Sequence, residues 1–412
     1  MSVEGLISRL TGGPERPETD RWLALVGVLL VGAGLVMVLS SSQALAYLNY
    51  RFALYYFVRQ VAFAALGFFL MAALRHLDYQ VLKRYAPAAA AITLLLMLLV
   101  LVPGLGIRVN GARRWFSLGP LGSFQPSEVA KLTFAIFMAR WVDKRRDRLN
   151  SFVHGFLPFA ILLGVALLIL MLQRDLGTAL VMCAIFCSIF FAGGGQPRYV
   201  VLLAVLLIGA FVLFTVFESY RAQRLAVFLD PFKDPLGAGF QSRQAILALG
   251  SGGLTGVGLG HSVQKYLWLP EAHTDFIFAI IGEETGLIGT TLVLVAFVVL
   301  ALRGYRGAMR APDRFGMALA AGITTWVAFQ ALLNMGTVTD TVPITGVTLP
   351  FISYGGTSLA ITMAGTGVLL NIAAQGGQQR YARRRTDATA DLGRRDGRPR
   401  AARARGGASV PR

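Results

Sequence analysis

The chain has 412 residues, of which 55% are apolar or aromatic and only 15% are charged. Soluble domains are about one quarter charged, whereas here the apolar residues form long uncharged runs, which excludes an ordinary water-soluble globule. The formal net charge of +18 does not indicate a nucleic-acid partner. Lys and Arg are confined to short segments between the runs and to the C-terminal end, so no basic domain is left to hold a duplex.

Runs of about 20 apolar residues are long enough to span a bilayer as helices. The sequence predicts an all-α polytopic membrane protein with about ten such helices. In chain order, the expected spans are residues 22–39, 52–74, 86–102, 128–142, 155–172, 176–192, 199–217, 274–302, 315–338 and 353–374.

The basic residues predict how these helices are oriented. If the N-terminus is cytoplasmic, the segments on that side hold 27 of the 39 Lys and Arg residues, as the positive-inside rule requires. We therefore expect both termini to be cytoplasmic. The expected organisation is a cytoplasmic N-terminal segment (1–21), a transmembrane domain (22–375) with a large outer loop between helices 7 and 8 (218–273), and a disordered basic cytoplasmic tail (376–412).

Several basic residues fall on the outer side, against this rule, and need another explanation. Arg113 and Arg114 precede a Trp, and Lys131 follows Glu128 by three positions, close enough to form an ion pair on one helix face. One interpretation is an interfacial anchor with a structural salt bridge. The other is a group of cations that binds an anionic substrate outside the membrane.

The start of the eighth span carries a carboxylate, Asp275, directly after Thr274. Either residue can cap the helix, because Asp and Thr side chains accept hydrogen bonds from the unpaired N–H groups of a first turn. A carboxylate at a membrane-embedded mouth is also a candidate general base. Periodicity alone leaves these two alternatives open.

Three further outer segments combine charged or polar residues with glycine and proline. Asp175 lies in a charged corner and is expected to cap the helix that follows it. The outer loop (218–273) is too long for a turn, and its apolar positions predict partly helical pieces that dip toward the membrane. Residues 343–358 contain two prolines and several glycines, and they either line a cavity or form a loop docked on the bundle.

Eight short motifs follow one another along the chain: residues 111–115 (GARRW), 125–128 (QPSE), 175–178 (DLGT), 234–239 (DPLGAG), 249–253 (LGSGG), 269–278 (LPEAHTDFIF), 282–284 (GEE) and 349–356 (LPFISYGG). Taken together and in this order, these motifs resemble the SEDS family (shape, elongation, division and sporulation proteins), over residues 22 to 375. The match is closer to the division branch of the family than to the elongation branch.

The resemblance implies a peptidoglycan glycosyltransferase that polymerises lipid II, an undecaprenyl-pyrophosphate-linked disaccharide pentapeptide, outside the bacterial cytoplasmic (inner) membrane during cell division or elongation. It implies a class B penicillin-binding protein transpeptidase as partner, beside other membrane proteins of the divisome or elongasome. Asp275 matches the family's catalytic carboxylate. The expected substrate-binding residues are Arg59, Arg113, Arg114, Gln125, Ser127, Glu128, Lys131, Asp175, Arg224, Gln264, Glu271, His273 and Ser353.

In such a reaction a sugar hydroxyl attacks the anomeric carbon of the donor, and Asp275 accepts the hydroxyl proton. Arginine side chains or a divalent cation (Mg²⁺ or Mn²⁺) would offset the charge of the pyrophosphate leaving group, although no spacing of residues demands a metal. Two alternatives from other classes remain: a lipid II flippase, since ten helices with embedded charges also describe carriers, and a non-enzymatic scaffold of the division machinery.

Overall fold

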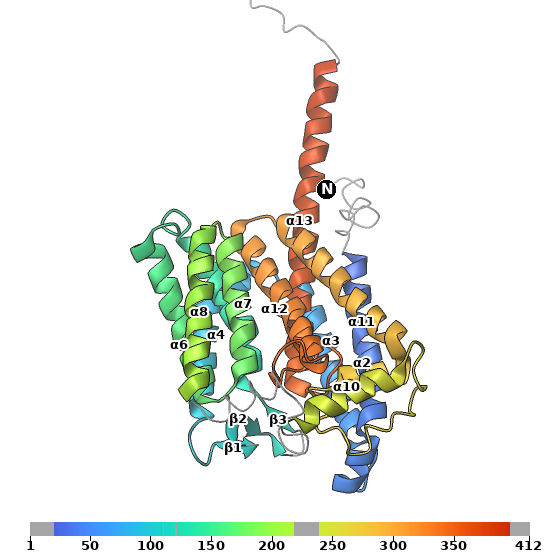
Figure 1. Cartoon of the computed structure of the whole chain (residues 1–412). Helices are drawn as coiled ribbons and strands as arrows, with labels where there is room; N and C mark the ends of the chain where they lie inside the picture. The colour runs from blue at the N-terminus through green and yellow to red at the C-terminus, as the bar shows by residue number, and fades with distance from the viewer. Residues whose placement is uncertain (1–19, 110, 120–121, 218–238, 396–412) are drawn as a thin grey trace, which may run out of the picture.

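The structure is a computed structural model that describes residues 20–109, 111–119, 122–217 and 239–395. Long helices stand side by side, and a small sheet covers one end of the bundle, called the sheet end here (Figure 1). A π-helical turn, η2 (Phe152–Phe156), precedes α6. The described helices are α2 (Arg21–Tyr50), α3 (Tyr55–His76), α4 (Tyr79–Leu99), α5 (Pro126–Lys144), α6 (Leu157–Leu172), α7 (Leu176–Ala192), α8 (Pro197–Phe217), α10 (Phe240–Gly252), α11 (Ile277–Met309), α12 (Arg314–Val338) and α13 (Gly356–Arg395).

Each of the ten expected spans overlaps one of these helices, so the prediction of an all-α polytopic membrane fold is confirmed. Within the described residues, seven helices are long and apolar enough to cross a membrane: α2, α3, α4, η2 with α6, α11, α12 and the first part of α13. Of the other three, α7 and the described part of α8 are shorter apolar helices, and α5 carries five charged residues. The chain is an integral membrane protein.

The outer helices expose many large apolar side chains, more than a water-soluble surface carries. Leu29 on α2, Phe69 on α3 and Leu292 on α11 are each at least 60% exposed. By contrast, α12 and the first part of α13 (Gly356–Gly377) are mostly buried, with Trp326 fully enclosed. This inside-out distribution fits a bundle whose surface contacts lipid hydrocarbon.

A three-stranded antiparallel sheet, which the sequence analysis did not predict, follows α4. Its strands β1 (Gly106–Val109), β2 (Ala112–Ser117) and β3 (Ser123–Phe124) pair in chain order. The Asn-Gly dipeptide between β1 and β2 is a strong hairpin signal and could have revealed it. The Thr357 hydroxyl, at the start of α13, lies 3.4 Å from the carbonyl oxygen of Ser123, which places the sheet against the bundle.

The segment between α12 and α13, called the connector here (residues 339–355), is docked into the bundle, as the second of the two alternatives for this region expects. It packs so closely on α2 that a Cβ at Gly34 would lie 2.5 Å from the carbonyl oxygen of Phe351. The side chain of Gln60 on α3 donates to the carbonyl of Ser353 at 3.0 Å and accepts from the amide of Gly355 at 3.3 Å. Helices far apart in sequence therefore hold the connector.

At the end of the bundle opposite the sheet end, side chains bind the short turn between α3 and α4. The Asn371 side-chain nitrogen donates to the carbonyls of Arg75 and Leu77, at 2.7 and 2.8 Å. From here α13 continues as a helix to Arg395, whereas the sequence analysis expected disorder from residue 376. The difference has a physical reason, because Ala, Arg and Gln favour helix even where apolar residues are scarce.

Candidate active site

Asp275 lies just before α11, one residue ahead of its N-cap position. The helix begins at Ile277, and the N-cap residue is Phe276, which makes no side-chain capping hydrogen bond. The Thr274 hydroxyl donates instead to the carboxylate of Glu271 at 2.8 Å. Neither Thr274 nor Asp275 therefore occupies the N-cap position of α11, which falls to Phe276.

The connector and α12 hold the Asp275 main chain. The side-chain nitrogen of Asn334 donates to the carbonyl oxygens of Asp275 and of Val347, both at 2.7 Å. Gly346 of the connector has a φ of +69°, and a Cβ added there would lie 3.4 Å from Asp275 Oδ2. Glycine suits this position because it adopts positive φ without strain and leaves room beside the carboxylate.

Ser353 and Tyr354 of the connector hold the residues just before Asp275. The Ser353 hydroxyl donates to the carbonyl of Thr274 at 2.6 Å and accepts from the amide of Leu349 at 2.8 Å. The amide of Tyr354 donates to the carbonyl of His273 at 2.9 Å. Ser353, expected to bind substrate, thus makes contacts that shape the loop, and its substrate role stays a prediction.

His273 is buried among aromatic rings. Its ring centroid lies 4.8 Å from that of Tyr56 and 5.5 Å from that of Tyr354. Burial lowers the pKa of the His273 imidazole, and the nearby Glu271 carboxylate opposes this shift. Burial also raises the pKa of the Tyr354 hydroxyl, against the opposing effect of Arg59. Both rings are therefore neutral at neutral pH, beside the segment that carries Asp275.

A second polar group of side chains surrounds Asp175, which caps α7 as predicted by accepting from the amide of Thr178 at 3.2 Å. Its Oδ2 lies 3.3 Å from both Gln125 Nε2 and Ser127 Oγ, and its Oδ1 lies 3.8 Å from Arg114 Nη1. The carboxylate is only 4% exposed. Four of the expected substrate-binding residues therefore meet in one corner, called the Asp175 corner here.

The two neighbouring arginines of β2 have different surroundings. Arg114 donates to the carbonyls of Gln173 and Arg174, and its side chain remains 20% exposed. Arg113 instead reaches the carbonyl of Leu101 at 3.5 Å, at the end of α4. Only Arg114 joins the Asp175 corner.

The Asp175 corner and Asp275 lie against the same stretch of the connector. In the first turn of α7, a Cβ at Gly177 would lie 2.7 Å from the carbonyl oxygen of Thr345 and even closer to the side chain of Val347. The main-chain carbonyls of Val347 and Asp275 both accept from the side-chain amide of Asn334. The structure thus brings together two regions separated by about 100 residues of sequence.

Lys131 and Glu128 form the predicted ion pair, at 2.8 Å, but in the interior of the bundle. The Lys131 side chain is 1% exposed, and its Nζ also donates to Gln330 Oε1 at 2.8 Å and lies 5.1 Å from the ring centroid of Trp326. These contacts match the structural interpretation. Substrate binding by either member of the pair stays a prediction.

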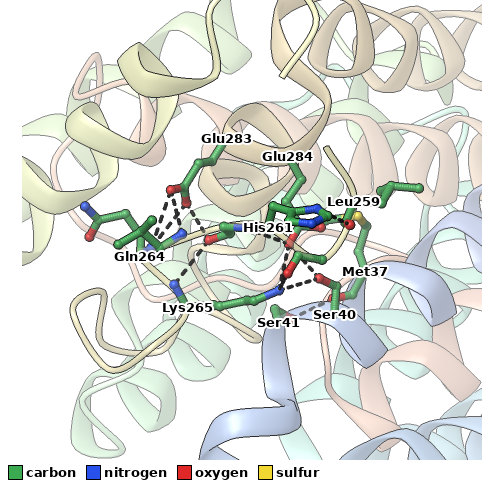
Figure 2. A network of polar contacts seen from close by, with 12 residues as sticks. Met37, Ser40, Ser41, Leu259, His261, Gln264, Lys265, Glu283 and Glu284 are labelled. Atoms are coloured by element: carbon green, nitrogen blue, oxygen red, sulfur yellow. Dashed lines mark hydrogen bonds and ion pairs between the residues drawn. The ribbon is translucent and has the colours of Figure 1, made fainter. Parts of the chain in front are cut away.

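A second buried ion pair joins Lys265, in the loop before Asp275, to Glu284 on α11 at 3.1 Å (Figure 2). The Ser40 hydroxyl on α2 donates to the same Glu284 oxygen at 2.6 Å and lies 3.2 Å from Lys265 Nζ. The ammonium also donates to the carbonyl of Gly260 at 2.5 Å. Three segments of the chain meet at this pair.

The neighbouring carboxylate, Glu283, fixes the main chain of the same loop. It accepts from the Ser262 hydroxyl at 2.5 Å and from the amides of Val263 and Gln264, at 2.9 and 3.4 Å (Figure 2). Gln264, an expected substrate-binding residue, is held here through its backbone. Within the described part of the chain, its side-chain oxygen is buried without a partner.

Of the remaining expected site residues, Glu271 and Arg59 both lie near the loop before Asp275: Glu271 accepts from Thr274, and Arg59 lies close to Tyr354. Glu271 is exposed and has a φ of +56°, while Arg59 lies 4.4 Å above the ring of Tyr55. Arg224 lies outside the described residues. Across the described ranges, there is no group of three or more His, Cys, Asp or Glu side chains that could hold a metal ion.

Sequence reasoning missed the residues that position the site: Gln330 and Asn334 on α12, and Ser40 on α2. Each is a polar side chain within an apolar helix, and Gln330 and Asn334 are four positions apart, on one helix face. Polar groups inside a membrane helix are functional candidates by default, and this signal was available in the sequence.

Comparison with known proteins agrees with these motifs. The family of cell cycle proteins FtsW/RodA/SpoVE matches residues 20–378. A Geobacter sulfurreducens protein named probable peptidoglycan glycosyltransferase FtsW is 42% identical over 353 residues, covering 86% of this chain and 94% of the relative. Stage V sporulation protein E of Bacillus subtilis is 40% identical over 358 residues, covering 87% and 98%.

Solved structures show the same fold. The rod shape determining protein RodA of Thermus thermophilus superimposes with a TM-score of 0.64 at 30% identity, covering 87% of this chain and 98% of that one. A chain from a peptidoglycan synthase complex that coordinates polymerization and crosslinking superimposes with a TM-score of 0.70 at 29% identity and the same coverage. The chain therefore belongs to the FtsW/RodA/SpoVE family.

Proposed function

We propose that the chain is a peptidoglycan glycosyltransferase that polymerises lipid II on the outer face of the cytoplasmic membrane. The Geobacter sulfurreducens relative, named as a probable peptidoglycan glycosyltransferase, supports this activity over most of the chain. The observation that carries the proposal is the placement of Asp275: its main-chain carbonyl is held by Asn334, and its carboxylate lies against Gly346 of the connector, just before α11.

The chemistry needs one base. The 4-hydroxyl of the acceptor sugar attacks the anomeric carbon of the donor, the bond from that carbon to the pyrophosphate oxygen breaks, and the hydroxyl proton passes to Asp275. A single displacement converts the α-linked donor into a β-linkage without a covalent enzyme intermediate, so no second nucleophilic carboxylate is required. The neighbouring Glu271 carboxylate already accepts from Thr274.

The pyrophosphate leaving group gains negative charge as the bond breaks, and preorganised cations stabilise that charge. Arg114 is the first candidate, because it is partly exposed and belongs to the Asp175 corner beside the connector. Arg59, Arg113 and Arg224 are further candidates by position in the sequence. A divalent cation would supply the same stabilisation.

The proposal includes a partner and an orientation. A class B penicillin-binding protein would crosslink the glycan as it is made, which fits the similarity to a chain from a complex that coordinates polymerization and crosslinking. Both termini would be cytoplasmic, because this orientation puts 27 of 39 basic residues inside. A cysteine placed at Lys233 should then react with a membrane-impermeant reagent in intact cells, and reaction only from the cytoplasmic side would contradict the orientation.

The decisive experiment separates a polymerase from the two alternatives. Purified full-length protein is incubated with purified lipid II, with and without its transpeptidase partner, and glycan length is measured on gels. A polymerase yields glycan strands. A flippase instead moves labelled lipid II between the leaflets of liposomes without forming glycan, and a scaffold does neither, so either of these outcomes would overturn the proposal.

A further inference from the structure

Asn334 connects the proposed base with the connector through a single nitrogen atom. Its side chain is 1% exposed on α12, and Nδ2 donates to the Asp275 and Val347 carbonyls, both at 2.7 Å. The contact to Asp275 is with the main chain, so it fixes the position of the residue. Gly346, the residue before Val347, lies against the Asp275 carboxylate.

The orientation of this amide is determined by its neighbours. Both partners are carbonyl oxygens, which can only accept, so the nitrogen must face them and the side-chain oxygen must point away. That oxygen is buried and has no partner in the described part of the chain. A buried acceptor without a partner is destabilising, and its retention in an interior calls for an explanation beyond packing.

A second amide, one helical turn before, repeats the arrangement. Gln330 donates through Nε2 to the carbonyl of Thr348 at 2.9 Å, and its Oε1 accepts from Lys131 and from the indole of Trp326, each at 2.8 Å. Residues four apart on a helix share a face. The two amides of α12 thus bind two consecutive connector carbonyls, and of the pair it is Asn334 that also contacts the Asp275 segment.

We propose that Asn334 is a positioning residue for Asp275: it holds the main chain of the base and the connector in one fixed arrangement, so that the carboxylate meets the attacking hydroxyl. This inference rests on the proposed function and deepens it. Proton transfer requires the base within hydrogen-bond reach of the hydroxyl, and a displacement of about 1 Å is expected to slow the reaction on the order of 100-fold.

The chain supplies a matched control. Asn371 on α13 is 4% exposed, and its Nδ2 donates to two main-chain carbonyls, those of Arg75 and Leu77, at 2.7 and 2.8 Å, at the end of the bundle away from Asp275. Its Oδ1 accepts from Gln375 at 3.0 Å. Removal of either amide takes the side-chain donor away from two main-chain carbonyls, so Asn371→Ala removes the same hydrogen bonds as Asn334→Ala at a distance from Asp275.

The experiment measures lipid II polymerisation by full-length wild type, Asn334→Ala and Asn371→Ala at equal folded amounts, with thermal midpoints recorded for each. We expect Asn334→Ala to lower kcat about 100-fold with KM for lipid II within about threefold, because the base is displaced while the substrate still binds. Asn371→Ala should lower the thermal midpoint similarly and keep kcat within about threefold of wild type. The pH profile of kcat is a further readout, and a loss of stability alone does not change it. In Asn334→Ala, the residual rate should no longer show the fall at acidic pH that is expected for a reaction that uses Asp275 as its base.

The outcomes separate this inference from the proposed function. If wild type polymerises lipid II and Asn334→Ala retains as much kcat as Asn371→Ala with an unchanged pH profile, Asn334 is structural and the inference fails. If Asn334→Ala does not fold, Asn334→Asp takes its place: it keeps the shape, and when ionised it has no donor for the two carbonyls, so the same loss of kcat is expected. If folded wild type does not polymerise lipid II, the proposed function itself fails.

Discussion

Two buried lysine–glutamate pairs brace different parts of the molecule. Lys131–Glu128 spans three positions of α5 in the interior, whereas Lys265–Glu284 joins a loop to α11 and is shared with Ser40 on α2. Both members of the first pair lie on α5, and Lys131 also donates to Gln330 on α12. The second pair closes the loop that leads to Asp275. With similar N–O distances of 2.8 and 3.1 Å, we expect the first pair to contribute mainly to stability and the second to the geometry of the site.

The largest effect is expected at the second pair. Lys265→Met leaves the Glu284 carboxylate buried without its cation, which should cost about 3–5 kcal/mol of stability and abolish polymerisation. In Lys265→Met with Glu284→Gln, we expect stability to recover further than activity, because the neutral pair no longer tethers the loop. Thermal midpoints and lipid II polymerisation measure the two quantities. If the double variant fully recovered both stability and polymerisation, the second pair would have no role in the site beyond stability, which would contradict the comparison with the first pair.

The first pair should behave differently. Lys131→Gln leaves Glu128 unpaired in the interior and should cost stability in the same range, about 3–5 kcal/mol, while Lys131→Gln with Glu128→Gln should recover both stability and polymerisation. The same two assays apply. A double variant that is as stable as wild type but inactive would instead show that the substrate needs the lysine charge, in favour of the substrate-binding prediction for Lys131.

A smaller effect is expected from Ser40, the α2 residue that bonds to the second pair. Ser40→Ala removes a hydroxyl that donates to Glu284 at 2.6 Å, and a hydrogen bond to a charged group contributes about 2 kcal/mol. Ser42, two residues on, is fully buried and its hydroxyl has no partner among the described residues, so Ser42→Ala should leave the thermal midpoint nearly unchanged. Equal midpoints for the two variants would contradict the role of Ser40.

The smallest effect is a pH dependence from His273. Burial lowers its folded-state pKa below the ordinary value of 6.5, so the unfolded chain binds the proton more readily. The stability that the neutral ring contributes is thus fully present above pH 6.5 and is lost as the pH falls toward the lowered pKa. His273→Phe keeps an aromatic ring but does not titrate, and its thermal midpoint should fall less between pH 7 and pH 5. Parallel curves for the two proteins would refute this.

The sequence allowed the local features of this fold to be predicted. Apolar runs predicted the helices, the i, i+3 spacing predicted the Lys131–Glu128 pair, and a corner aspartate predicted the cap at Asp175. Each depends on neighbours within a few positions, where helix geometry alone decides which side chains meet.

Long-range contacts were not predictable in this way. Nothing local indicates that Lys265 meets Ser40, or that Asn334 holds both Asp275 and Val347, because the partners depend on how the connector docks. The start of α11 also differs from the expected one for this reason, since the loop before it is held by the connector and the helix begins at Ile277, two residues after Asp275.

The central claim, that Asp275 is the catalytic base, is tested most directly by the polymerisation rate of Asp275→Asn on purified lipid II. Asparagine keeps the shape and hydrogen bonding of the side chain but cannot take a proton. Asp313→Asn, at the cap of α12, is the matched control, because asparagine caps a helix as well as aspartate does. We predict that Asp275→Asn folds and forms no glycan while Asp313→Asn polymerises at about the wild-type rate; wild-type polymerisation by Asp275→Asn at equal membrane levels would contradict the claim.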